Sequence, residues 1–241
     1  MHGRLSRSAR MDNSKGRLDR EVIMQGAHVH AFRAALGSIP SSQPIAFVDR
    51  DGVLNHGREG YVNNPEQLML LPGVEESVAK LNQAGFAVCV VTNQSPLMRG
   101  LWGFERLESI HEHLQSVLLE GHSEAVLDAV ITCPHRRRDM CSCRKPQPGM
   151  LHLGNQLLRY DGPSASMTNG LHETGTNDVD WWSPKPVPPN ALDTMVGDRR
   201  SDMGAGWAYG ARLFRVNPHL GLASVVDRIV DLTQPGDEFQ P

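Results

Sequence analysis

The sequence is poor in the features that mark membrane, secreted and nucleic-acid-binding proteins. No apolar run approaches the roughly 18 residues of a membrane-spanning helix, and the longest, residues 86–91, has only the length of a buried strand. The formal net charge of −3 supplies no basic field. We therefore expect no membrane partner and no nucleic-acid partner. Aromatic residues make up only 5% of the chain, which fits a soluble α/β protein better than an aromatic-rich β-sandwich.

Cysteine is also scarce, with four residues in 241. Residues 1–37 are polar and basic and contain no apolar core of a secretory signal, which predicts a cytoplasmic protein. Because cytoplasmic thiols stay reduced, we expect the cysteines to be metal ligands or buried thiols rather than disulfides. Residues 1–43 are expected to form a flexible N-terminal extension, residues 44–234 a domain, and residues 235–241 a tail. A monomer is the favoured state.

What the chain does contain is an alternation of short apolar runs and amphipathic segments. Runs typical of buried strands are followed by apolar residues at helical spacing, with Gly or Pro between them. Strands that alternate with helices predict a parallel sheet covered on both faces, a three-layer, doubly wound Rossmann-like fold. The predicted strands are residues 45–48, 86–91, 125–132, 192–196 and 211–216, and the predicted helices include 73–84, 105–119, 148–159 and 222–232.

One segment, residues 161–190, interrupts this alternation. It is rich in Gly, Pro, Ser, Thr and Asn, and it separates a helix from the next strand. A loop of this length is uncommon in a compact domain unless it is functional or disordered. Trp181 and Trp182 would be unusual in pure disorder. Two interpretations are open, a surface insertion whose tryptophans pack locally and a substrate lid. We favour the surface insertion.

Acidic residues follow two of the predicted strands. Asp49 and Asp51 come directly after residues 45–48, and Asp198 comes after residues 192–196. In open parallel sheets, ligands bind in the crevice outside the carboxyl ends of the strands. Three carboxylates meeting there would repel one another without a cation, and Mg²⁺ takes oxygen ligands from carboxylates and phosphate. The competing interpretation is a polar turn, since Asp and Gly are common turn residues.

The Asp-x-Asp spacing also allows a division of chemical roles. Side chains alternate along an extended backbone, so Asp49 and Asp51 can point the same way. One carboxylate can attack phosphorus while the other gives a proton to the leaving oxygen. Thr92 and Asn93 end another strand, where they could hold a phosphate oxygen. Lys145, next to Arg144, could keep a nearby carboxylate ionised and offset phosphoryl charge.

A second cluster contains three of the four cysteines, and it lies just before Arg144. A set of three Cys and one His is a standard tetrahedral zinc site. The alternative is a reduced, metal-free loop. A zinc ion with four protein ligands has no open position for chemistry, so its role would be to fix the loop that presents Arg144 and Lys145. The expected ligands, within the loop of residues 133–143, are Cys133, His135, Cys141 and Cys143.

Four segments together resemble the motifs of the haloacid dehalogenase superfamily. They are Phe-Val-Asp-Arg-Asp-Gly-Val-Leu-Asn (47–55), Val-Thr-Asn-Gln-Ser (91–95), Arg-Lys-Pro (144–146) and Val-Gly-Asp-Arg-Arg-Ser-Asp-Met (196–203), in the family's order. The resemblance implies a haloacid dehalogenase-like phosphatase domain with a minimal cap. It further implies Asp49 as nucleophile, Asp51 as acid/base, Thr92 as phosphate binder and Lys145 as charge stabiliser, with magnesium held by Asp49, Asp198 and the Asp51 backbone carbonyl.

Within this superfamily, the cysteine-rich loop is similar to that of the heptose bisphosphate and histidinol-phosphate phosphatases. Asn55 with residues 60–62, and residues 144–150, resemble the heptose enzymes, whereas Pro96 and Met98 depart from their pattern. The resemblance implies hydrolysis of the C7 phosphate of D-glycero-D-manno-heptose 1,7-bisphosphate through an aspartyl-phosphate. The expected substrate contacts are Asn93, Arg99 and Arg144.

Several other functions are compatible with parts of this pattern. A histidinol-phosphate phosphatase or a broad sugar-phosphate phosphatase would use the same chemistry. A nucleic-acid 3′-phosphatase would need a basic groove, which the composition does not indicate. A non-catalytic, zinc-stabilised binding module is the alternative from another class, and the intact Asp49, Asp51, Lys145 and Asp198 argue against it.

Overall fold

The computed structural model describes residues 26–32, 39–160 and 178–238. Most of the expected N-terminal extension, the first part of the 161–190 insertion and the end of the tail lie outside the described residues. Within this part of the chain, no helix is both long and apolar enough to cross a membrane.

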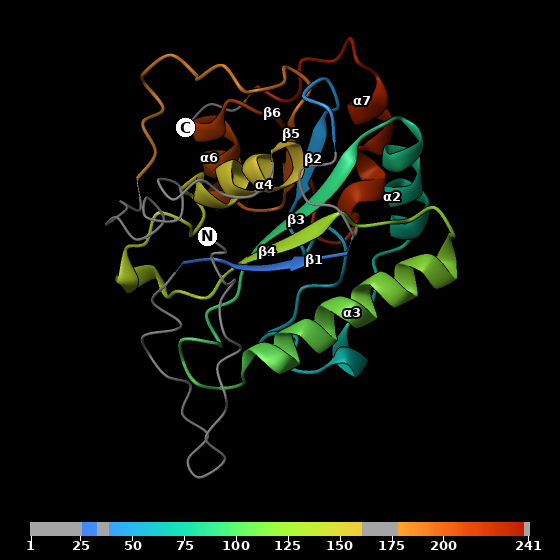
Figure 1. Cartoon of the computed structure of the whole chain (residues 1–241), viewed down its shortest axis with the longest axis vertical. Helices are drawn as coiled ribbons and strands as arrows, with labels where there is room; N and C mark the ends of the chain where they lie inside the picture. The colour runs from blue at the N-terminus through green and yellow to red at the C-terminus, as the bar shows by residue number, and fades with distance from the viewer. Residues whose placement is uncertain (1–25, 33–38, 161–177, 239–241) are drawn as a thin grey trace, which may run out of the picture.

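The centre of the structure is a six-stranded sheet in the order β1-β4-β3-β2-β5-β6 (Figure 1). Every neighbouring pair is parallel except β1 and β4, which are antiparallel. The parallel, doubly wound sheet predicted from the sequence is thereby confirmed, and the antiparallel β1 at its edge was not predicted. The strands are β1 (His28–Ala31), β2 (Ile45–Val48), β3 (Ala87–Asn93), β4 (Ala129–Cys133), β5 (Thr194–Gly197) and β6 (Arg212–Arg215).

Helices cover both faces of the sheet because its central strands are apolar on both sides. In β2, Ala46 and Val48 belong to one core and Ile45 and Phe47 to the other, as the alternation of side chains along a strand requires. Figure 1 shows α4 and α6 on one face and α2, α3 and α7 on the other. The helices are α2 (Val74–Gln83), α3 (Phe104–Gly121), α4 (Gly149–Arg159), α6 (Arg200–Tyr209) and α7 (Val226–Val230), with short 3₁₀ turns at Pro65–Gln67, Arg137–Asp139 and Gly221–Ser224.

The strand order reverses at β2. The chain passes from β2 to β3 and β4 on one side and then returns to place β5 on the other side of β2. In open α/β sheets, the carboxyl ends of the strands at such a reversal form the crevice in which ligands bind. The ends of β2, β3 and β5 are therefore where the functional site is expected.

The prediction for the N-terminal segment was wrong for residues 28–31. These residues form β1, which pairs with β4 within the range 1–43 expected to be flexible. The sequence pattern does not indicate this strand because it lies at the edge of the sheet and its side chains are only partly buried or exposed. A half-buried edge strand needs no apolar run, and His28 and His30 give it a polar composition.

Candidate active site

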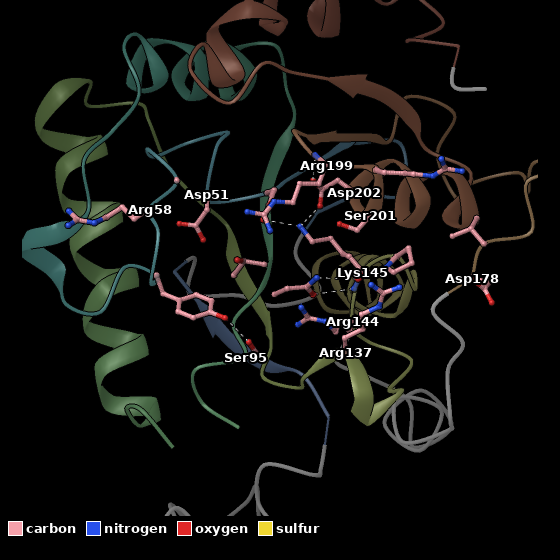
Figure 2. A pocket seen from close by; sticks show the side chains of 18 of the residues that line it. Asp51, Arg58, Ser95, Arg137, Arg144, Lys145, Asp178, Arg199, Ser201 and Asp202 are labelled. Atoms are coloured by element: carbon pink, nitrogen blue, oxygen red, sulfur yellow. Dashed lines mark hydrogen bonds and ion pairs between the residues drawn. The ribbon is translucent and has the colours of Figure 1, made fainter. Parts of the chain in front are cut away.

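Side chains from three parallel strands meet at the reversal point. Asp49 follows β2, Thr92 is the second-last residue of β3, and Asp198 follows β5. Beside them is a pocket of about 840 Å³, lined by residues that include Asp49, Asp51, Thr92, Asn93, Lys145 and Asp202. Figure 2 shows Lys145 and Asp202 close together, with Arg58 and Asp178 on opposite sides of the pocket.

Lys145 joins two buried carboxylates. Its Nζ lies 2.9 Å from Asp49 Oδ1 and 2.7 Å from Asp202 Oδ1, and it donates a hydrogen bond of 2.8 Å to the Val91 carbonyl. Burial alone would lower the pKa of Lys145, but the two carboxylates outweigh burial and raise that pKa. Burial raises the pKa of Asp49 to about 6, against the opposing charge of Lys145. The lysine therefore stays charged next to the carboxylate at the end of β2.

The Asp51 carboxylate is held by donors. Arg50 Nη2 lies 3.0 Å from Oδ2, Asn55 Nδ2 donates to Oδ1 at 2.9 Å, and Gln94 Nε2 donates to Oδ2 at 2.9 Å. Burial would raise the pKa of Asp51, but the Arg50 charge and these hydrogen bonds outweigh burial and lower it. The carboxylate is thus ionised, which is the form that can accept a proton from water.

Three carboxylates gather at a single point. One oxygen from each of Asp49, Asp198 and Asp202 lies within 4.8 Å of the other two. Asp198 Oδ1 is buried without a hydrogen-bond partner in the described part of the chain. Burial and the nearby Asp49 raise the pKa of Asp198. An unpartnered buried oxygen within a carboxylate group suits a hard cation such as Mg²⁺, so these residues fit the expected metal.

Gly52 allows this close arrangement. Its φ is +82°, a conformation that residues with a Cβ rarely adopt. A Cβ at this position would lie 2.9 Å from both Cγ and Oδ2 of Asp198. The turn after β2 therefore needs glycine both for its backbone angle and for room beside the Asp198 carboxylate.

Sequence reasoning missed Asp202 as a site residue. The expected magnesium ligands were the carboxylates of Asp49 and Asp198 and the backbone carbonyl of Asp51, and the structure places the Asp202 carboxylate beside those of Asp49 and Asp198. Asp202 Oδ2 also accepts from the Arg199 N–H at 2.9 Å and so caps α6. A third carboxylate in the first helical turn after a strand-end Asp was the signal available in the sequence.

The expected substrate contacts occupy different positions. Asn93 exchanges two hydrogen bonds of 3.2 Å with the backbone of Lys145, so it braces that residue while lining the pocket. Arg144 also lines the pocket, and its Nη1 donates to the His135 carbonyl at 2.7 Å. Arg99 is exposed, with its guanidinium 5.8 Å from the centre of the Tyr61 ring, and it is not among the described lining residues.

The pocket has more positive charge than the sequence analysis anticipated. Besides Arg144 and Lys145, further arginines from separate segments line it, namely Arg58, Arg137, Arg199 and Arg200. Part of the 161–190 insertion borders the pocket as well, through Asp178, Val179 and Trp181. The expected local packing holds for Trp181, whose ring lies 5.6 Å from that of Trp207, but Trp182 is 90% exposed.

The four predicted zinc ligands converge. The sulfurs of Cys133, Cys141 and Cys143 lie 3.3–3.6 Å from one another, and His135 Nδ1 lies 3.3 Å from Cys143 Sγ and 3.5 Å from Cys133 Sγ. No disulfide joins these thiols. Hydrogen bonds from the neighbouring thiols lower the pKa of Cys141, whereas burial raises the pKa of Cys133 and the bond to Cys133 raises that of Cys143. Three sulfurs and one imidazole nitrogen at this spacing fit a tetrahedral zinc ion.

Comparison with known proteins agrees with this geometry. No family model matches the chain. It is 41% identical over 117 residues to the D-glycero-beta-D-manno-heptose-1,7-bisphosphate 7-phosphatase of Bordetella bronchiseptica, which covers 48% of this chain and 63% of that protein. It is 35% identical over 133 residues to the protein of the same name from Escherichia coli K12, covering 52% and 68%. The chain thus spans slightly less than two thirds of the first curated relatives that it matches.

Solved structures give the same picture. A HAD-like phosphatase from Mesorhizobium loti superposes with a TM-score of 0.64 at 23% identity, covering 90% of this chain and 97% of that one, and shows the fold. The D,D-heptose 1,7-bisphosphate phosphatase of B. bronchiseptica, complexed with magnesium and phosphate, gives 0.59 at 28% identity, covering 78% and 98%.

The fold is that of a haloacid dehalogenase-like phosphatase. Within that class, the chain belongs to the family of D-glycero-beta-D-manno-heptose-1,7-bisphosphate 7-phosphatases.

Proposed function

We propose that this protein is a magnesium-dependent phosphatase that hydrolyses the C7 phosphate of D-glycero-D-manno-heptose 1,7-bisphosphate. The observation that carries the proposal is the buried Asp49 carboxylate, paired at 2.9 Å with Lys145 and grouped with Asp198 at the sheet's reversal point. The sugar substrate is supported by the names of the relatives, and magnesium by the neighbouring structure that holds magnesium and phosphate.

In the proposed reaction, Asp49 and Asp198 would hold magnesium, which when bound supplies positive charge to the phosphate oxygens. An Asp49 oxygen attacks phosphorus, and the bond between phosphorus and the sugar O7 breaks. Lys145 lies beside the attacking carboxylate and offsets the charge of the phosphoryl group. Thr92 Oγ1 accepts from Gln94 Nε2 at 2.9 Å, so its own hydroxyl proton can be donated to a phosphate oxygen.

Asp51 would transfer the protons. The pKa of its carboxylate is lowered in the free protein, and the negative charge of an entering phosphate favours the protonated form, so Asp51 takes up one proton from solvent as the substrate binds. Protonated Asp51 then donates to the departing sugar oxygen. In the second half of the reaction it takes a proton from water, the water oxygen attacks phosphorus, and the bond to Asp49 breaks. Inorganic phosphate leaves, Asp51 returns its proton to solvent, and both carboxylates regain their starting forms.

The cysteine cluster supports a positional role for zinc. It ends immediately before Arg144 and Lys145, and the Arg144 guanidinium bonds the carbonyl of the zinc-ligand candidate His135. A zinc ion with four protein ligands would fix the loop that carries both cations to the pocket. The thiolates this requires are consistent with the cytoplasmic location expected from the sequence.

The experiment is phosphate release from heptose 1,7-bisphosphate and from histidinol phosphate, measured side by side with and without MgCl₂. Wild type is expected to need magnesium and to prefer the heptose. Asp49→Asn should abolish release of both, because the amide cannot attack phosphorus. Asp227→Asn is the matched control, since Asp227 is exposed and pairs with Lys80. A preference for histidinol phosphate would refute the heptose assignment, and full activity of Asp49→Asn would refute the mechanism.

A further inference from the structure

The first described residues of the insertion form one wall of the active-site pocket. Asp178, Val179 and Trp181 line the pocket, and we call this segment, residues 178–181, the insertion wall. Figure 2 shows Asp178 on the side opposite Arg58, with Lys145 between them. A leaving group that extends from the attacked phosphate toward Asp178 therefore meets the insertion wall.

The insertion wall is fixed to elements that carry catalytic groups. Trp207 Nε1, from α6, donates to the Asp180 carbonyl at 3.2 Å, and Gln147 Nε2 donates to the Asp178 carbonyl at 3.3 Å. A Cβ on Gly204 would lie 2.9 Å from Val179 Cγ2. The insertion wall thus packs closely against α6 and against the segment that follows Lys145.

The same Cβ on Gly204 would lie 2.8 Å from Pro146 Cβ. Glycine at this position therefore lets both the insertion wall and the residue after Lys145 approach α6. Because the attachments come from two separate segments, the wall has a defined position relative to the reacting groups.

Trp181 connects the insertion wall to a positive charge. Its ring lies 5.6 Å from the Trp207 ring, and the Arg200 guanidinium carbon lies 5.8 Å from the centre of the Trp181 ring. Arg200 is the first residue of α6, is exposed, and lines the pocket. An exposed arginine otherwise samples many rotamers, and contact with an indole face restricts that freedom.

We propose that Trp181 is a specificity-determining residue that positions Arg200 to bind the leaving group of the substrate. The ligand class is a polyhydroxylated, anionic leaving group that is long enough to reach α6 from the attacked phosphate. A small ester, in contact only with the groups around Asp49, gains nothing from Arg200. This proposal rests on the proposed phosphatase function and adds the element that selects the leaving group.

The test compares a large and a small substrate in matched variants. For heptose 1,7-bisphosphate, Trp181→Ala and Arg200→Gln are each expected to lower kcat/KM about tenfold, mainly by raising KM. Trp181→Ala removes the cation–π contact that holds Arg200, and Arg200→Gln removes the charge that binds the anionic leaving group. For phenyl phosphate, kcat/KM should stay within about twofold, because the groups around Asp49 are unchanged. The double variant should lose no more activity than the more impaired of the two single variants, because the two side chains act together.

Trp182→Ala is the control, since this neighbouring tryptophan is 90% exposed and is not among the described lining residues. It should leave both substrates unaffected. Equal losses on both substrates, or no loss on either, would overturn the proposal. Trp181→Phe replaces Trp181→Ala if the latter does not fold. If wild type turns over another large sugar phosphate instead of the heptose, the heptose assignment fails, and the large-to-small ratio is measured with that ester.

Discussion

Lys145 and Asp202 form a buried ion pair, with Nζ 2.7 Å from Oδ1 and both side chains almost fully shielded from water. The same ammonium lies 2.9 Å from Asp49. Removing one partner of a buried pair leaves an uncompensated charge, which is strongly destabilising. We infer that Asp202 holds Lys145 in place beside the carboxylate that attacks phosphorus.

This arrangement distinguishes two carboxylates that lie in one group. Asp198→Asn should raise the magnesium concentration for half-maximal activity by about tenfold or more, because Asp198 has a buried oxygen that receives no hydrogen bond within the described part of the chain. Asp202→Asn should lower kcat about tenfold to a hundredfold with little change in that concentration, because it alters the position of Lys145. Phosphate release titrated with MgCl₂ measures both quantities. A shifted magnesium dependence in Asp202→Asn would identify Asp202 as a metal ligand instead.

Gly52 gives a second prediction with a close control. Gly52→Ala places a Cβ 2.9 Å from the Asp198 carboxylate, at a φ of +82°. Gly85 has the same φ, but a Cβ there would meet nothing within 4 Å. Both substitutions should cost about 1–2 kcal/mol in the free energy of unfolding from backbone strain. Only Gly52→Ala should also abolish magnesium-dependent phosphate release. Urea unfolding and activity assays separate the two effects, and equal activity in both variants would contradict the steric argument.

The cysteine cluster predicts a stoichiometric metal. Elemental analysis of purified protein should find about one zinc per chain, and removing a ligand with Cys143→Ala should lower that content markedly. Cys89→Ala is the control, since Cys89 is a buried thiol in β3 that is not part of the cluster of candidate ligands. A chelator should lower the Tm of wild type and of Cys89→Ala but not of Cys143→Ala. Less than about half an equivalent in wild type, with a Tm indifferent to chelator, would argue against a structural zinc.

The fold could be predicted because its central strands carry their own signal. β2 and the first five residues of β3 are buried apolar runs, and parallel strands must bring their carboxyl ends to one edge. The meeting of Asp49, Thr92 and Asp198 follows from that rule alone.

What the sequence could not reveal depends on contacts between distant segments. The role of Asp202 is set by the approach of Lys145 from another loop, and Trp181 lines the pocket while its ring packs on Trp207. The direction of the Arg99 side chain, over Tyr61, is likewise a matter of tertiary packing. Residue type and spacing do not specify such partners.

His111 predicts how stability depends on pH. It is fully buried in α3, its ring centre lies 6.0 Å from that of His30 in β1, and both of its nitrogens are without hydrogen-bond partners in the described structure. Burial, and then the charge of Arg50, lower the pKa of His111 well below its ordinary value of 6.5. As the pH falls below that value, the unfolded chain binds a proton that the folded chain does not. The free energy of unfolding therefore falls with decreasing pH.

Between about pH 7.5 and pH 5.5, this single group should remove about 1.4 kcal/mol from the free energy of unfolding. His111→Phe keeps a ring of similar size and cannot take up a proton, so its loss over the same interval should be smaller by that amount. His219→Gln, at an exposed position, should lose as much as wild type. Urea unfolding at the two pH values measures the difference. Parallel losses in wild type and His111→Phe would mean that the imidazole takes up its proton over the same pH range in the folded protein as in the unfolded chain.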